Sequence, residues 1–117
     1  MHFYKLNGSI ISSITELPYD ELIPNTSDGA GEKHVPVISI NDNTITISVG
    51  SVAHPMLDVH YITLVAIETQ LNGLTGYQVK YLKPGMKPEV VYELSKGEKV
   101  IAAYEYCNLH GLWKAEL

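Results

Sequence analysis

Beyond residue 35, apolar and polar positions largely alternate with the period of two that is typical of half-buried β-strands. Short runs rich in β-branched and aromatic residues are separated by turn formers, among them Asn41-Asp42-Asn43, Asn72-Gly73 and Lys96-Gly97. From this pattern we expect strands at residues 37–40, 44–49, 61–71, 76–81, 88–94 and 99–106, and no convincing helix.

The spacing of these strands predicts an all-β fold, in which two antiparallel sheets pack as a sandwich of about seven strands. Within that class we favour an immunoglobulin-like topology. The sandwich is expected over residues 22–117, behind a short N-terminal arm at residues 1–21. In the arm, an apolar stretch near Asn7-Gly8 predicts a small hairpin or an arm that packs on the domain or on a partner subunit. Turn formers crowd residues 18–31 and predict a connector.

The composition is that of a folded globular protein, with 117 residues, of which 45% are hydrophobic and 18% charged. A formal net charge of −5 without a basic stripe argues against nucleic acid as a partner. Apolar runs stay below the roughly 18 residues of a membrane helix, so we expect no membrane partner. We see no secretory signal, and a single cysteine favours a reducing cytoplasm. The overall charge would repel a small anion, so an anionic substrate would need local positive charge.

Candidate chemistry gathers in three segments, which hold four of the five histidines and the single cysteine. The residues are His34, His54, His60, Cys107 and His110. A thiolate three residues before an imidazole is a natural chelate for a soft or borderline metal. Each residue alone has an ordinary explanation, because a single histidine is usually a hydrogen-bonded surface residue and a single cysteine a small buried hydrophobe. Their occurrence together therefore predicts one metal site.

The donor set restricts the metal. Four imidazoles and one thiolate exceed the usual four-coordinate shell of zinc. A copper electron-transfer site uses two histidines, one cysteine and a weak axial ligand such as methionine, and no methionine follows His110 in this segment. Four nitrogens with one axial sulfur leave an octahedral metal with one open position, which fits iron. A copper-type electron carrier and a binding module with structural zinc, or with no metal, remain the alternatives.

Three motifs, taken in order and with their spacing, resemble the superoxide reductases (desulfoferrodoxin and neelaredoxin) over residues 22–117. They are Glu-Lys-His-Val-Pro-Val at 32–37, His-Pro-Met at 54–56 with His-Tyr-Ile at 60–62, and Glu-Tyr-Cys-Asn-Leu-His-Gly-Leu-Trp-Lys at 105–114. The resemblance implies an immunoglobulin-like sandwich that holds one mononuclear non-haem iron ion. The implied ligands are His34, His54, His60 and His110 in the equatorial plane and Cys107 as the axial thiolate.

The resemblance also implies a reaction, the one-electron reduction of superoxide to hydrogen peroxide. It assigns Glu32 as the carboxylate that fills the sixth position in the oxidised resting state. It assigns Lys33 as the cation that attracts superoxide and helps to protonate the product. Backbone N–H groups of residues 108–110 are expected to hydrogen-bond the sulfur. The family expectation for partners is rubredoxin as electron donor and a homodimer or homotetramer.

Two features depart from the family pattern. Val59 stands before His60 where the family usually has an acidic residue, although Asp58 comes one step earlier; we expect this to alter the surface or the surroundings of the site and not ligation. Residues 3–15 look like the degenerate first hairpin of a desulforedoxin-like module that has lost its cysteines, so a second iron centre is not expected. An unrelated N-terminal arm is the alternative.

Overall fold

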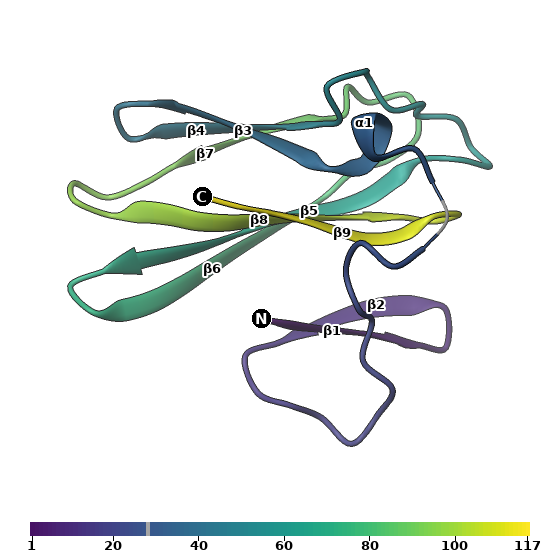
Figure 1. The fold of residues 1–117 in the computed structure, drawn as a ribbon, viewed down its shortest axis with the longest axis horizontal. Helices are drawn as coiled ribbons and strands as arrows, with labels where there is room; N and C mark the ends of the chain where they lie inside the picture. The colour runs from purple at the N-terminus through teal and green to yellow at the C-terminus, as the bar shows by residue number, and fades with distance from the viewer. Residues whose placement is uncertain (28) are drawn as a thin grey trace.

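Three antiparallel sheets make up the computed structural model, which describes residues 1–27 and 29–117 (Figure 1). The smallest pairs β1 (His2–Leu6) with β2 (Ser9–Ser13). The three-stranded sheet has the order β3 (Pro36–Asn41), β4 (Thr44–Val49), β7 (Glu89–Glu93). The four-stranded sheet has the order β6 (Leu74–Tyr81), β5 (Ile62–Leu71), β8 (Lys99–Cys107), β9 (Gly111–Glu116).

The two larger sheets pack face to face around one core, which confirms the predicted sandwich. Alternation puts Ile45, Ile47 and Val49 of β4 in this core, opposite apolar side chains of β5 and β8. A buried hydrogen bond also joins the sheets, because the Tyr92 hydroxyl donates to the Val65 carbonyl at 2.7 Å. Within the described residues the sandwich has seven strands, three in one sheet and four in the other.

The N-terminal arm forms the predicted hairpin, and it packs on its own domain. β1 and β2 meet at a turn through Asn7 and Gly8, both with positive φ. Phe3 enters a second apolar cluster on the outer face of the four-stranded sheet, where its ring centroid lies 5.1 Å from that of Tyr104. The Leu22 N–H donates to the Phe3 carbonyl at 2.8 Å. The hairpin therefore closes the outer face of the sheet that carries Cys107.

Two elements differ from the expectation. One turn of helix, α1 (Gly31–His34), stands where the connector and a loop were expected. Four residues are too few to show a helical period, so this turn of helix could not be predicted from the hydrophobic pattern. β9 was not predicted, because Leu112 and Trp113 are adjacent and both buried, which breaks the alternation. Asp28, part of the expected connector, lies outside the described residues.

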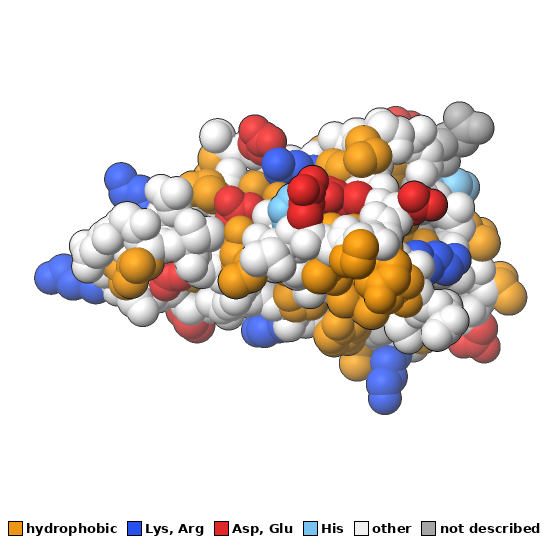
Figure 2. Space-filling view, turned by 90° about the horizontal axis from the view of Figure 1, so that it is seen from below, with side chains coloured by type: hydrophobic (Ala, Val, Ile, Leu, Met, Phe, Trp, Pro, Cys, Tyr) orange, Lys and Arg blue, Asp and Glu red, His pale blue; other side chains and the backbone are white. Residues whose placement is uncertain are grey.

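Among the described residues, no helix is long and apolar enough to cross a membrane. On the face shown in Figure 2, lysine side chains lie apart from one another, between acidic and apolar ones. The boundary between arm and domain at residues 21 and 22 stays a prediction.

Candidate metal centre

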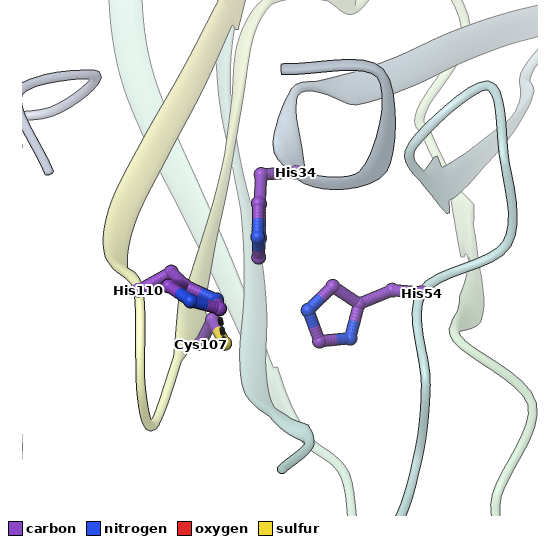
Figure 3. Close-up of side chains that lie close together, drawn as sticks. All are labelled: His34, His54, Cys107 and His110. Atoms are coloured by element: carbon purple, nitrogen blue, oxygen red, sulfur yellow. Dashed lines mark hydrogen bonds between the residues drawn. The ribbon is translucent and has the colours of Figure 1, made fainter. Parts of the chain in front are cut away.

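The five predicted ligands lie at one end of the sandwich, at the ends of strands and of α1 or in the segments that connect them. His34 is the last residue of α1, and Cys107 is the last residue of β8. His110 directly precedes β9, while His54 and His60 lie in the segment between β4 and β5. Figure 3 shows His34, His54, Cys107 and His110 turned toward one point. One donor atom from each of these four residues lies within 4.8 Å of the others.

His60 completes a closed ring of four imidazoles. The ring centroid of His34 lies 4.7 Å from that of His54 and 4.8 Å from that of His110. His60 lies opposite His34, with centroid distances of 4.7 Å to His54 and 5.0 Å to His110. The sulfur of Cys107 lies 3.9 Å from Nδ1 of His110. The structure thus brings all five predicted residues to a single cluster.

The nitrogens of this cluster have the state that a metal site needs. Nδ1 of His54 is 2.6 Å from the Pro55 carbonyl, so it carries the proton and leaves Nε2 free to ligate. Three ring nitrogens are buried and have no hydrogen-bond partner among the described residues: His34 Nδ1, His54 Nε2 and His60 Nε2. Burying an unpaired polar atom is unfavourable. His34 Nδ1 lies 3.5 Å from a Glu105 carboxyl oxygen, whereas a coordinated cation would satisfy the two Nε2 atoms. These orphaned nitrogens and the soft sulfur therefore fit a bound transition metal.

Three of the four imidazoles, those of His34, His54 and His60, are also held neutral. Burial, followed by the charges of His54, His110 and His60, lowers the pKa of His34 from 6.5 to about 4. Burial is likewise the main reason why the pKa values of His54 and His60 are lowered. Neutral imidazole is the form that binds metal, so protons do not compete for these nitrogens near pH 7.

Cys107 is fully buried, and burial raises the pKa of its thiol. Hydrogen bonds from the backbone N–H groups of Leu109 and His110 act against this and lower the pKa. Both N–H groups belong to the 108–110 turn, so this effect on the pKa agrees with the prediction that the turn acts on the sulfur. Because burial is the larger effect, the sulfur needs a neighbouring cation to remain a thiolate.

The side chain of Asn108 connects the segment around His60 to the turn that follows Cys107. The Asn108 amide group accepts from the Tyr61 N–H at 2.9 Å and donates to the Val59 carbonyl at 3.1 Å. The Asn108 backbone N–H donates to the Tyr61 carbonyl at 3.2 Å. The segment around His60 is thus fastened to the turn that follows Cys107. The Val59 side chain itself is 74% exposed, so the departure from the family pattern lies on the surface.

Two neighbours of His34 have contacts that the sequence analysis missed. Trp113 stacks on the His34 ring with centroids 5.0 Å apart, and its Nε1 donates to the His110 carbonyl at 3.0 Å. Glu105 is completely buried, and its Oε2 lies 3.5 Å from His34 Nδ1. Burial raises the pKa of Glu105 well above its usual value. Period-two alternation was the available signal, since it places Glu105 on the same face of β8 as Cys107.

Glu32 and Lys33 lie on α1 beside His34, and both are exposed to solvent. The positive charge of Lys33 is among the causes that lower the pKa values of His34, His54 and His60. Lys33 therefore lies close enough to act electrostatically on the imidazole ring cluster. It offers the local positive charge that a protein of net charge −5 needs to attract an anion.

Comparison with known proteins gives one family. The family model described as desulfoferrodoxin matches residues 26–116. The chain is 54% identical over 91 residues to the desulfoferrodoxin of Nitratidesulfovibrio vulgaris, an alignment that covers 78% of this chain and 68% of that protein. It is 40% identical over 111 residues to the desulfoferrodoxin of Clostridium acetobutylicum, covering 95% of this chain and 82% of that one.

Solved structures agree with this assignment. The crystal structure of the superoxide reductase from Treponema pallidum matches with a TM-score of 0.85 and 32% identity, and the match covers 99% of both chains. The superoxide reductase from Giardia intestinalis matches with a TM-score of 0.62 and 33% identity over 74% of this chain and 99% of that one. The chain belongs to the desulfoferrodoxin family.

Proposed function

We propose that this chain is a superoxide reductase, which reduces superoxide to hydrogen peroxide at a single iron ion. One observation carries the proposal: four imidazoles and one cysteine sulfur converge at one end of the sandwich, in a chain related to proteins named superoxide reductase. The family membership and the donor set favour iron over the copper and zinc alternatives.

The residues that would hold the iron are His34, His54, His60, His110 and Cys107. When bound, the iron supplies one electron to superoxide, which together with two protons gives hydrogen peroxide. The chain's own residues prepare this step. Burial keeps the imidazoles of His34, His54 and His60 neutral and available as ligands. The N–H groups of Leu109 and His110 hold the sulfur by hydrogen bonds and moderate its basicity.

Lys33 and Glu32 are proposed to act from α1. The Lys33 ammonium attracts the superoxide anion to the site against the negative charge of the whole protein, and it assists protonation of the product. The Glu32 carboxylate would serve as a further ligand of the iron in the oxidised resting protein. Their exposure and their place next to His34 support both roles.

The electron donor, the assembly and the location are proposed from the family alone. We propose rubredoxin as the donor, a homodimer or homotetramer, and a cytoplasmic location. The half-buried state of His60 and His110 supports electron entry at this end of the sandwich. We also propose that the β1–β2 hairpin is the remnant of a desulforedoxin-like module, on a domain that begins at residue 22.

Metal content, colour and stoichiometry test the function. The purified protein is expected to hold one iron per chain and, when oxidised, to absorb in the red through thiolate-to-iron charge transfer. Superoxide should be converted to hydrogen peroxide in equal amount, with a supplied electron and without release of dioxygen. A colourless zinc protein, an intensely blue copper protein, or dioxygen release in the amount expected for dismutation would each overturn the proposal.

The role of Lys33 is tested by Lys33→Ala against Lys96→Ala. Both variants remove one exposed positive charge, but Lys96 lies in the turn before β8, at the opposite end of that strand from Cys107. Lys33→Ala is expected to slow the reaction with superoxide at low salt and to flatten its dependence on ionic strength, with iron retained. Equal salt dependence in the two variants would refute steering by Lys33.

A further inference from the structure

The four-residue helix α1 has little to hold it in place by itself. A single helical turn is unstable alone, and α1 has no side-chain cap at its N-terminus. Its internal backbone bonds are those from the Lys33 N–H to the Ala30 carbonyl and from the Val35 N–H to the Gly31 carbonyl, at 3.0 and 2.9 Å. The position of Glu32 and Lys33 must therefore be fixed by contacts with the rest of the protein.

Those contacts come from Trp113, which stacks on the His34 ring, and, for the backbone of α1, from the turn at residues 50–52, which follows β4. The carbonyl of Glu32 accepts hydrogen bonds from the Val52 N–H at 2.9 Å and from the Ser51 hydroxyl at 3.3 Å. The Gly50 N–H donates to the Val35 carbonyl at 3.2 Å, at the other end of α1. Both ends of the helical turn are thus bonded to this one turn.

Gly50 lies directly against the α1 backbone. A Cβ atom built on Gly50 would stand 2.7 Å from the Glu32 carbonyl oxygen, 2.7 Å from the Lys33 carbonyl carbon and 2.6 Å from the Val52 carbonyl oxygen. All three are backbone atoms, which cannot rotate aside as a side chain can. Gly50 also has φ +80, a conformation that other residues rarely adopt. The close approach of turn and helix requires glycine here.

We propose that Gly50 is a positioning residue for the reaction. Through the backbone of Glu32 and Lys33 it sets how close the Lys33 ammonium and the Glu32 carboxylate come to the metal centre. The same turn leads into His54, which is four residues after Gly50. It therefore fixes α1 relative to the segment that carries a predicted ligand. This inference rests on the proposed roles of Glu32 and Lys33, but the contact itself can be tested without them.

The test compares Gly50→Ala with Gly73→Ala. Gly73 has φ +78 in an exposed turn, and a Cβ there meets nothing within 4 Å. Both variants therefore share the strain of a positive φ, and only the first forces α1 away. Ser51→Ala is the milder companion, since it removes one bond to the Glu32 carbonyl and adds no atoms. It keeps the proposal testable if Gly50→Ala does not fold.

The first readout is amide hydrogen exchange in the metal-free protein. Gly50→Ala is expected to speed exchange at the Val52 N–H by about tenfold or more, with a smaller increase in Ser51→Ala and none in Gly73→Ala. Because this readout needs neither iron nor superoxide, it is independent of the proposed function. Unchanged exchange at Val52 in Gly50→Ala would overturn the contact and with it the proposal.

The second readout uses the iron-loaded protein. Gly50→Ala should retain iron, shift the charge-transfer band of the oxidised form in the same direction as Glu32→Ala, and flatten the salt dependence of the superoxide rate. Added to Lys33→Ala, it should change the salt dependence little further, because both act through one charge. Gly50→Ala could instead show faster exchange at Val52 but the same charge-transfer band and salt dependence as Gly73→Ala. That result would show that Gly50 holds α1 but does not position Glu32 and Lys33.

Discussion

The metal-free protein should lose stability in acid through His34. Its pKa is about 4 in the fold and 6.5 in the unfolded chain. At pH values between these two pKa values, the unfolded chain binds a proton at His34 that the folded protein does not bind. The free energy of unfolding therefore falls as the pH falls. The gap is about 2.5 in pKa, and at about 1.4 kcal/mol for each unit His34 contributes roughly 3 kcal/mol. That contribution is fully present above pH 6.5 and lost by about pH 4.

Urea denaturation of the metal-free protein and of His34→Gln at pH 7.5 and pH 4 measures this contribution. Gln is neutral at both pH values, so the other titrating groups cancel when the two proteins are compared. The free energy of unfolding of the unmodified protein should fall by about 3 kcal/mol more than that of the variant. A difference between the two proteins that does not change with pH would refute the argument that burial holds His34 neutral.

Two further predictions concern bonds that support the site. Tyr92→Phe removes the buried hydroxyl that bonds the Val65 carbonyl across the sandwich, and should lower the free energy of unfolding by about 1–3 kcal/mol. Iron content should not change, and a loss of iron at full stability would contradict this. Asn108→Ala removes both side-chain bonds to the Tyr61 N–H and the Val59 carbonyl. Its iron affinity, measured by chelator competition, should fall about 10–100-fold, and an unchanged affinity would show that these bonds do not orient the ligands.

The sandwich was predictable because most of its strands bury one face. The hairpin of β3 and β4 follows the expected ranges closely, and its alternation names the residues of the core. β9 escaped because its two buried side chains, Leu112 and Trp113, are adjacent in a short strand. Leu112 joins the outer cluster beneath the N-terminal hairpin, while Trp113 stacks on His34, so no alternation remains to be read. α1 escaped because its position depends on the distant turn at residues 50–52 and not on its own four residues.

The ligand set was predictable for a different reason. Imidazole and thiolate are the donors of transition metals, and this chain has few of them outside three short segments. Glu105 shows the limit of that reasoning. A carboxylate in a strand is ordinarily solvated. Alternation places Glu105 on the same face as Cys107, but only the fold shows that it lies beside His34 with no hydrogen-bond partner for its oxygens among the described residues. The candidate donor atoms could be identified from residue type alone. The side chains that surround them, such as Glu105, could be identified only from the structure.

The donors are prepared for a metal to different degrees. The fold itself keeps the imidazoles of His34, His54 and His60 neutral, so a cation displaces no proton from them near pH 7. The Cys107 sulfur is different, because burial raises the pKa of its thiol further than the two backbone N–H groups lower it. A cation must therefore take the place of the proton on this one atom. Around neutral pH, the dependence of metal binding on pH should thus come from the sulfur, and the dependence of stability on pH in acid from the imidazoles.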